Sequence, residues 1–384
     1  MSRNEMKILH INCNYMGTKL HQVMIEHLEK LVKINSVFCP IYKGSELVTK
    51  PNNNVVVSQC FNFMDRFFFF NKQKKIISSI EKNMNINKHN IIHAYTLFTD
   101  GNAAYELSRK YNIPYVVAVR STDIEFFTYR LNLRKRGIEI LENASAVFFL
   151  AKSTQDKVME RYIPENKKQG IVGKSYIIPN GIDDFWIDNI YSQKEINKTV
   201  ERINNKELNI ICVAQIIKRK NIPMIQKSVS VLKEEGWKVK FRIIGKVVDQ
   251  KEYKRITKDL NTEWIAPVSK EKLITYYREA DLFVLPSKFE TFGLVYAEAM
   301  SQALPVIYLE NEGFDGQFEE GTVGYRTKDD KNILVNKIKK ACENYKTISC
   351  NCVEKVHVFT WKNICGEYFR IYNEILNNDE RSSV

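Results

Sequence analysis

The chain has 384 residues, of which 44% are hydrophobic and 27% charged, and its formal net charge is +13 at pH 7. This length exceeds what one hydrophobic core serves well, so two domains are expected. No apolar run approaches the ~18 residues of a membrane-spanning helix and the first residues lack the pattern of a secretory leader, so the expected location is the cytoplasm.

The positive charge is concentrated in the first 140 residues. A basic surface suits phosphate ligands, anionic lipid or nucleic acid, and charge alone does not choose among them. The sequence contains no zinc-finger spacing, RNA-recognition signature or basic zipper, so nucleic acid is not an expected partner. The cysteines are scattered, with only Cys350 and Cys352 close together, and we expect no metal site.

The first half of the chain alternates strand-like and helix-like segments. An apolar run at residues 6–14 leads into a turn at Gly17 and then a helical pattern over 21–32. Further strands are predicted at 55–57, 91–94, 115–119, 146–150 and 176–178. Such alternation predicts a parallel, doubly wound sheet. Gly17 either lets the backbone approach a ligand closely or is a plain turn glycine.

Residues 61–75 combine several phenylalanines with lysines and an arginine. A segment of this kind can lie in a lipid interface, where each cation contributes about 1 kcal/mol near an anionic surface. The alternative is that the rings are buried against the first domain. On the first interpretation the protein docks on the inner face of the cell membrane.

The strand and helix cycle restarts after a polar stretch at residues 188–207. Strands are predicted at 208–214, 240–244, 282–285 and 305–307, which indicates a second doubly wound domain. Near the end, residues 359–376 carry large apolar side chains at helical spacing. We interpret this stripe as a structural face of a helix.

The strongest local motif lies in residues 280–307. A buried strand is followed by a loop with Glu290, and Gly293 leads into a helix that runs through Met300. A helix start preceded by glycine presents free backbone N–H groups and a positive dipole end, which together favour a phosphate. Glu290 and Glu298 flank this start, and they either bind sugar and ribose hydroxyls or are plain loop and surface charges.

The two glutamates, set in Pro-Ser-x-x-Glu-x-Phe-Gly-Leu, resemble the hallmark of the retaining GT-B glycosyltransferases, in particular glycosyltransferase family four. Segments similar to other motifs of this family occur in the family's order, at 91–95, 118–123, 177–183, 213–222, 241–246 and 264–287. The resemblance implies an α/β GT-B fold, with two Rossmann-like, doubly wound parallel-sheet domains facing across a cleft. Its parts would be an acceptor-binding domain at 1–190, a donor-binding domain at 191–358, and a C-terminal helix, 359–384, crossing back to the first domain.

The resemblance also implies roles for individual residues. Glu290 would hold the hydroxyls of the donor sugar, Glu298 the ribose, and Lys220 the diphosphate leaving group, unless Lys220 is a solvated surface lysine. Other donor-side residues would be Gln215, Arg219, Gly245, Ala266, Pro267, Phe292, Gly293 and Leu294. The family commonly has an arginine at the position of Gln215, so either Lys218 or Arg219 compensates or the donor is held more weakly.

A second departure lies in the first domain, where residues 120–123 read Arg-Ser-Thr-Asp and many relatives read His-Gly-x-Asp. Arg120 cannot act as a base, but it can anchor a phosphate or an acidic acceptor. Asp123 would bind or polarise the acceptor, or else pair with Arg120 or cap the next helix. His93 and Asn180 are also assigned to the acceptor side, although a core position is an equal alternative for His93.

The sequence thus predicts a glycosyltransferase that moves a sugar from a nucleotide-sugar, in particular a UDP-sugar, to a glycan or lipid-linked acceptor with retention of configuration. Cell-surface polysaccharide biosynthesis in bacteria is the expected setting. We expect no metal and no cofactor, because Lys220 and the helix start at Gly293 supply positive charge. The alternatives are a GT-B-like UDP-sugar 2-epimerase and a noncatalytic sugar-nucleotide-binding protein.

Overall fold

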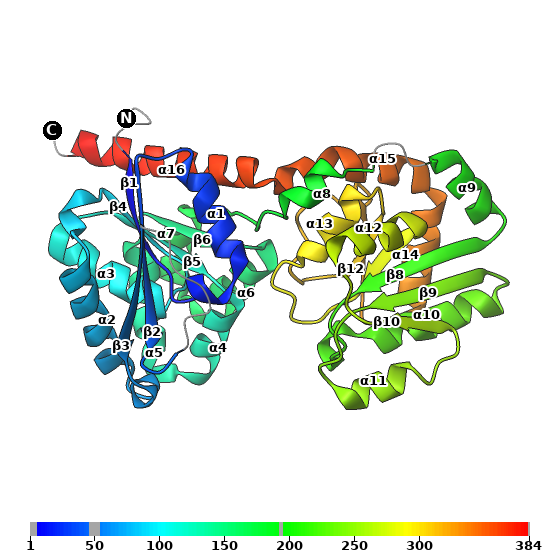
Figure 1. Cartoon of the computed structure of the whole chain (residues 1–384), viewed down its shortest axis with the longest axis horizontal. Helices are drawn as coiled ribbons and strands as arrows, with labels where there is room; N and C mark the ends of the chain where they lie inside the picture. Colours follow the sequence, from blue (N-terminus) through cyan, green and yellow to red (C-terminus); the bar gives the residue numbers. More distant parts are fainter. Residues whose placement is uncertain (1–5, 46–53, 192–194, 383–384) are drawn as a thin grey trace. The chain divides into compact units, whose positions relative to one another are not determined.

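The computed structural model describes residues 6–45, 54–191 and 195–382. Contacts between residues divide the chain into two compact units (Figure 1). The first unit comprises residues 1–150, 154–179 and 361–384, and the second comprises 151–153 and 180–360. The main boundary therefore lies between residues 179 and 180, and the C-terminal helix belongs to the first unit.

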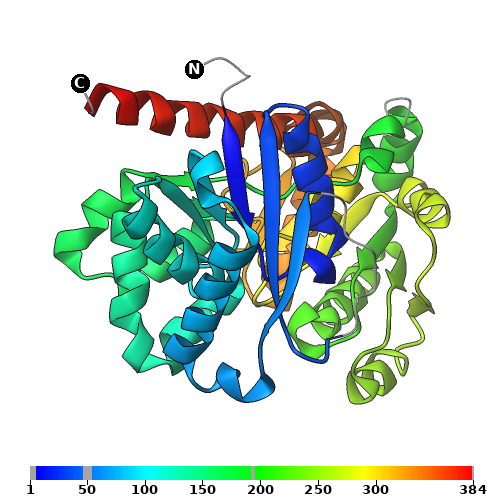
Figure 2. The same ribbon diagram turned by 60° about the vertical axis from the view of Figure 1, so that its left-hand side comes forward.

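The first unit contains a parallel seven-stranded sheet in the order β3-β2-β1-β4-β5-β6-β7. Its strands are β1 (Lys7–Ile11), β2 (Ile34–Tyr42), β3 (Val55–Phe61), β4 (Ile91–Ala94), β5 (Tyr115–Val119), β6 (Ala146–Phe149) and β7 (Ser175–Ile177). Figure 2 gives a second view, in which the early strands (blue) face the viewer. The predicted parallel sheet is confirmed, but β2 was not predicted, because Asn35, Ser36 and Pro40 interrupt its apolar pattern.

Helices cover both faces of this sheet. They are α1 (Lys19–Glu29), α2 (Phe69–Asn83), α3 (Thr99–Tyr111), α4 (Ser121–Tyr129), α5 (Leu131–Asn143), α6 (Lys152–Tyr162), α7 (Glu165–Val172) and α16 (Trp361–Ser382), with 3-10 turns η1 (Tyr15–Gly17), η2 (Phe63–Arg66) and η3 (Ile86–Lys88). Apolar residues of α2, α3 and α5 form the core on one face. Those of α1 and α16 form the core on the other.

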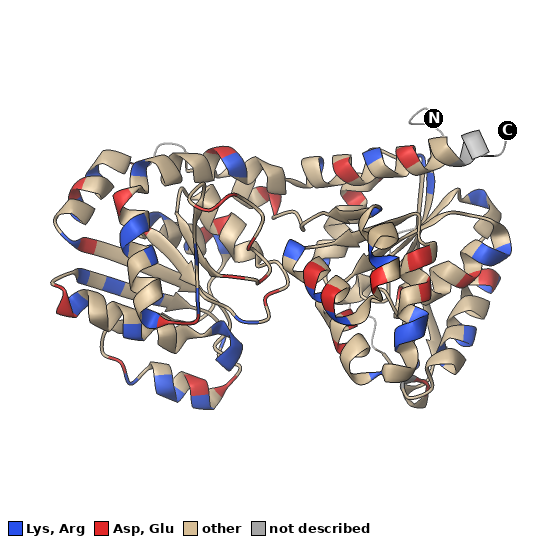
Figure 3. Ribbon diagram, turned by 180° about the vertical axis from the view of Figure 1, so that it is seen from behind, with Lys and Arg blue, Asp and Glu red and all other residues tan. Residues whose placement is uncertain are grey.

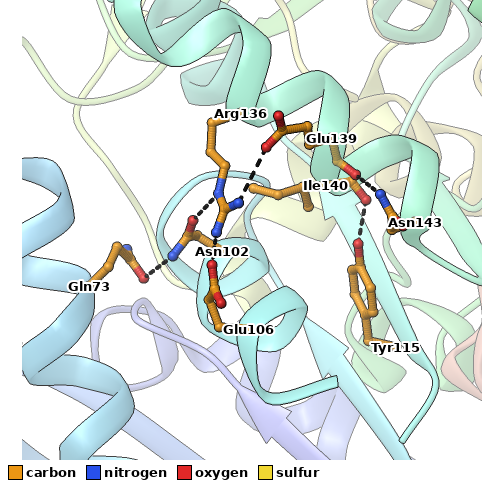
Figure 4. Close-up of polar contacts among 8 residues, drawn as sticks. All are labelled: Gln73, Asn102, Glu106, Tyr115, Arg136, Glu139, Ile140 and Asn143. Carbon is orange, nitrogen blue, oxygen red and sulfur yellow. Dashed lines mark hydrogen bonds and ion pairs between the residues drawn. The ribbon is translucent and has the colours of Figure 1, made fainter. Parts of the chain in front are cut away.

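A buried polar network joins α2, α3 and α5 (Figure 4). The Arg136 guanidinium donates to Asn102 Oδ1 over 2.6 Å and also pairs with Glu106. Asn102 in turn donates to Gln73 Oε1 over 3.1 Å, and Gln73 donates to the carbonyl of Thr99. Because buried polar groups are costly when unpaired, this chain of bonds fixes the position of α2 against α3.

The second unit contains a parallel six-stranded sheet in the order β10-β9-β8-β11-β12-β13. Its strands are β8 (Glu207–Val213), β9 (Lys238–Ile244), β10 (Thr262–Ile265), β11 (Leu282–Leu285), β12 (Val306–Leu309) and β13 (Gly324–Thr327). Its helices are α8 (Asp184–Asp188), α9 (Ile196–Asn204), α10 (Ile222–Glu234), α11 (Gln250–Ile256), α12 (Lys270–Glu279), α13 (Leu294–Ser301), α14 (Lys331–Glu343) and α15 (Tyr345–Lys355), with η4 (Lys218–Lys220) and η5 (Val356–Phe359). The predicted second doubly wound sheet is confirmed, and the short edge strands β10 and β13 were not predicted.

The C-terminal helix α16 packs on the first unit, as predicted. Its buried face includes Trp361, Tyr368 and Tyr372, which share one core with Met24 and Leu28 of α1. Acidic and basic positions alternate along its outer surface (Figure 3). Among the described residues, no helix has the length and hydropathy needed to cross a membrane.

Candidate functional site

The candidate site of the second unit lies where its sheet changes direction. β8 pairs with β9 on one side and with β11 on the other. The loops that follow β8 and β11 at their carboxyl ends therefore lead away to opposite faces of the sheet, and ligands of parallel α/β sheets commonly bind at such a switch point. Lys220 follows β8 and Glu290 follows β11, so both predicted residues lie in these two loops.

Lys220 and Glu290 form an ion pair across the two loops. Lys220 Nζ lies 2.5 Å from Glu290 Oε2, and the side chains are only 10% and 12% exposed. Arg219 Nη1 lies 4.0 Å from the same carboxylate oxygen. The amide of Lys288 also donates to the carbonyl of Arg219 over 2.7 Å, so a backbone bond ties the loops together. Lys220 is therefore not a solvated surface lysine.

Gly293 begins the helix that the motif predicted. It has φ +82°, a left-handed conformation that glycine adopts at little cost, and it precedes α13 without any capping side chain. A Cβ atom at Gly293 would lie 2.5 Å from the ring of Tyr296 and 3.2 Å from Cγ of Glu290. The uncapped amides of the first helical turn thus lie beside the Lys220–Glu290 pair, in an arrangement suited to an anion.

Two residues that support this loop were missed in the sequence. The carboxylate of Glu312 accepts from the amide of Glu290 over 3.0 Å, and the amide of Gly313 donates to the carbonyl of Glu290 over 3.0 Å. A Cβ atom at Gly313 would lie 2.4 Å from the backbone of Thr291, so no larger residue fits. No motif marks either residue, because the contacts form only after β12 brings its following loop back to the site.

Glu298 lies on α13 in a second polar cluster. Burial raises its pKa from 4.5 to about 7, while the nearby charge of Lys270 and a bond from the Tyr277 hydroxyl act in the opposite direction. The Tyr277 hydroxyl lies 3.5 Å from Glu298 Oε2. Lys270 forms an ion pair with Asp183, which caps α8. Glu298 is thus not a free surface charge, and it can either accept or donate a hydrogen bond near neutral pH.

The remaining donor-side residues lie in loops at the same carboxyl edge. Gly245 follows β9, and a Cβ atom there would lie 1.8 Å from the carbonyl oxygen of Ala214, so glycine is required for close packing of β8 and β9. Ala266 and Pro267 follow β10 and are exposed. Gln215 is exposed as well. Phe292 is buried, so only its backbone is available to a ligand, and Leu294 is the first residue of α13.

In the first unit, Asp123 is engaged by the backbone. Its carboxylate accepts from the amides of Arg120, Leu97 and Phe98, over 2.8, 3.1 and 3.4 Å. Burial raises the pKa of this carboxyl to about 6, while these bonds lower it. Asp123 therefore caps α4 and ties it to the loop after β4. Arg120 does not pair with it through the side chain, because its Nε donates to the carbonyl of Tyr95 over 3.1 Å.

His93 is fully buried in the core beneath α16. Its Nδ1 lies 2.7 Å from the hydroxyl of Tyr372, and its ring stacks on Tyr95 with centroids 4.3 Å apart. Burial holds its pKa well below the usual value, and the nearby guanidinium of Arg120 acts in the same direction. This position matches the core alternative for His93.

Gly17 is exposed, has an ordinary backbone conformation, and leaves open space where a Cβ atom would be. Asn180 is half-buried at the start of the second unit. Two polar residues near Gly17 were missed in the sequence. Asn12 is fully buried after β1 and its amide nitrogen has no acceptor among the described residues. Asp100, whose pKa is raised by burial to about 7, accepts from the amide of Cys13 over 3.1 Å.

Across the described ranges, no three histidine, cysteine, aspartate or glutamate side chains gather in a way that could hold a metal ion. Metal independence stays a prediction, since the sequence argument for it concerns the charge that Lys220 and α13 supply.

Comparison with known proteins gives a consistent result. Residues 193–352 match the family described as glycosyl transferases group 1. The capsular polysaccharide biosynthesis glycosyltransferase CapM of Staphylococcus aureus is 25% identical over 72% of this chain and 74% of its own length. The alpha-monoglucosyldiacylglycerol synthase of Acholeplasma laidlawii is 26% identical over 62% of this chain and 63% of its own length.

Solved structures extend the likeness to the whole fold. A sucrose-phosphate synthase from Thermosynechococcus elongatus superposes with a TM-score of 0.71 at 17% identity, covering 97% of this chain and 100% of that one. Anabaena Alr3699/HepE in complex with UDP and glucose superposes with a TM-score of 0.65 at 15% identity, covering 96% and 100%. The chain therefore has the GT-B fold, and its residues 193–352 are similar to the glycosyl transferases group 1 family.

Proposed function

We propose that this protein transfers a sugar from a UDP-sugar donor to a glycan or lipid-linked acceptor, with retention of configuration and without a metal. The observation that carries the proposal is the cluster of Lys220, Glu290 and Gly293 in the loops that follow β8 and β11. It combines a desolvated cation, a carboxylate and free helix amides, which are the groups needed to hold a sugar diphosphate.

In the proposed mechanism the diphosphate lies against the start of α13 and Lys220. The bond between the sugar C1 atom and the diphosphate oxygen breaks as C1 bonds to the acceptor oxygen. The proton of the acceptor hydroxyl passes to the departing diphosphate oxygen on the same face of the sugar. Lys220 stabilises the negative charge that develops on the leaving group, and loss of such a contribution typically costs ~3 kcal/mol.

Without donor, Lys220 is neutralised by Glu290. The diphosphate would take over the ammonium, leaving Glu290 to accept hydrogen bonds from the sugar hydroxyls. Arg219, 4.0 Å from Glu290, is better placed than the exposed Lys218 to replace the charge missing at Gln215. Glu298 would bind the ribose hydroxyls.

The relatives support the proposed acceptor class. One is named for capsular polysaccharide biosynthesis and another for synthesis of a glucosyl diacylglycerol. On this basis we place the protein in assembly of bacterial cell-surface polysaccharide or glycolipid, at the inner face of the membrane. Arg120 is the proposed anchor for an acidic acceptor, with Gly17 and Asn180 on the acceptor side. Asp123 has the geometry of a positioning residue, because its carboxylate bonds to backbone amides.

The test is donor binding and turnover with UDP-sugars and a cell-wall or lipid acceptor extract, with EDTA present. UDP should bind, and labelled sugar should pass to the acceptor without added metal. Conversion of the UDP-sugar to its 2-epimer in the absence of acceptor would instead assign the protein to that class. Binding with neither transfer nor epimerisation would indicate a noncatalytic binder.

A further inference from the structure

The first unit exposes an apolar surface at η2 and the start of α2. Phe63, Met64, Phe67, Phe68 and Phe70 are each between 54% and 62% exposed. The alternative in which the rings of this segment are buried is therefore wrong for these side chains. Among described residues of the first unit, the other exposed large apolar side chains are Tyr129, Leu131 and Val172. We call the five side chains of η2 and α2 the aromatic surface.

Buried contacts hold the backbone of this surface in place. The Asp65 carboxylate accepts from the amide of Asn62 over 2.7 Å and pairs with Lys75, also over 2.7 Å. On its inner side α2 buries Ile76 and Ile80 and is bonded through Gln73 to α3. The rings thus extend from an element that is fixed to the core, and their exposure is a property of the folded unit.

A basic groove lies beside the aromatic surface, between α2 and the edge strand β3. Its volume is about 520 Å³, and it is lined by Lys43, Ser58, Lys74, Ser78 and Lys82 with their neighbours, without any acidic side chain. Among the described residues, Lys43, Lys74 and Lys82 form no ion pair. Unpaired ammonium groups and hydroxyls in one groove suit phosphate oxygens.

The position of these features relates them to the acceptor side. In a parallel sheet all strands end at the same edge, so η2, which follows β3, lies at the edge where Gly17 follows β1 and Arg120 follows β5. Leu131 begins α5, which leads back to the start of β6 at the opposite edge, so it too lies on the carboxyl side. The apolar rings and the acceptor-side loops therefore lie at one end of the unit, together with Lys43, which follows β2, whereas Lys74 and Lys82 lie along α2 as it leads back from this end.

We propose that the first unit docks on an anionic lipid bilayer, with the aromatic surface inserted among the headgroups and the groove lysines bound to lipid phosphates. Rings alone would suit an apolar protein partner and lysines alone a free anion, but the two side by side match the charged and apolar layers of a bilayer. Docking would bring a lipid-linked acceptor to the loops at Gly17 and Arg120. This last step rests on the proposed function, whereas docking itself does not.

The experiment is flotation of the full chain with vesicles of phosphatidylcholine alone or with 30% phosphatidylglycerol, at low and high salt. We expect binding only to the anionic vesicles, and weaker binding at high salt. In K74S/K82S the partition coefficient should fall roughly 25-fold, since each basic residue contributes roughly fivefold. In F67S/F68S it should fall at least tenfold, because two rings no longer insert.

Matched controls come from exposed positions of the second unit. K251S/K254S on α11 removes the same charge, and V248S/L260S removes two exposed apolar side chains. Both controls should bind vesicles like the unmodified chain. The docking proposal is overturned if the unmodified chain ignores anionic vesicles, binds neutral ones equally well, or is affected as much by the controls. UDP affinity, measured in parallel by calorimetry, should be unchanged in all four variants, and its absence from the unmodified chain would count against the proposed donor and not against docking.

Discussion

Replacing Lys220 with methionine is the most informative perturbation of the candidate site. Methionine keeps much of the side-chain length but removes an ammonium group 2.5 Å from Glu290, in a place where both side chains are nearly buried. Removing one partner of a buried ion pair costs ~3–5 kcal/mol, because the other charge is left desolvated. Arg219, 4.0 Å away, offsets part of this, so we expect a loss of about 2 kcal/mol in the free energy of unfolding.

The effect on turnover should be larger and should have a different origin. If Lys220 stabilises the departing diphosphate, kcat should fall about 100-fold to 1,000-fold. Adding E290Q to K220M separates the two effects. The double variant has neither charge, so urea unfolding should show that it regains most of the free energy of unfolding lost in K220M. Its turnover should stay low. UDP affinity should drop in K220M while uridine affinity stays the same, because uridine has no diphosphate.

K218M is the matched control, since Lys218 is an exposed lysine of the same 3-10 turn. It should leave stability and turnover nearly unchanged. The reasoning would be refuted by a double variant that regains turnover together with stability, because Lys220 would then act only as a structural partner of Glu290. Equal losses in K218M and K220M would also refute it, since any nearby positive charge would then suffice.

Three further outcomes follow from the geometry. Burial raises the pKa of Glu298 to about 7, so the native state keeps a proton that the unfolded state loses near 4.5, and the free energy of unfolding falls as pH rises between these values. E298Q should therefore be more stable than the unmodified chain at pH 8, by up to about 3 kcal/mol. Urea unfolding should show that this difference vanishes near pH 4. G293A places a Cβ atom 2.5 Å from the Tyr296 ring at φ +82°, so calorimetry should show lost UDP binding and thermal melting a loss of at least about 1–2 kcal/mol. D123A leaves backbone amides unpaired and should cost about 2 kcal/mol in the free energy of unfolding, while UDP affinity, a property of the second unit, stays unchanged. A drop in UDP affinity in D123A would contradict the assignment of UDP binding to the second unit alone.

Much of the fold could be predicted from sequence, because parallel strands buried on both faces are apolar runs between helices. The exceptions have physical causes. β2 is a central strand that contains Pro40 and two polar residues near its start, and its pairing with β1 overrides the local pattern. β10 and β13 are edge strands of four residues, too short and too polar to give a period.

The candidate site likewise contains residues that the sequence could indicate and residues that it could not. Glu290 and Gly293 stand out in the motif after a predicted strand, whereas Lys220 was assigned through the family resemblance. Glu312 and Gly313 could not be found, since the contact of Glu312 with residue 290 spans 22 positions, that of Gly313 one more, and both depend on the path after β12. Sequence-based prediction was also limited because the sequence does not show which side chains are buried. The sequence left open whether Asp123 caps a helix, and only the packing of α4 against the loop after β4 shows that its carboxylate is occupied.

Because α16 packs on the first unit, the core around β1 and α1 is complete only after α16 has been synthesised. Trp361, Tyr368 and Tyr372 fill the same core as β1 and α1, yet they are synthesised more than 300 residues later. On the ribosome the second unit is complete earlier and can fold while the first still lacks one wall of its interior. Substitutions that disrupt the buried face of α16 should therefore destabilise the core around β1 and α1.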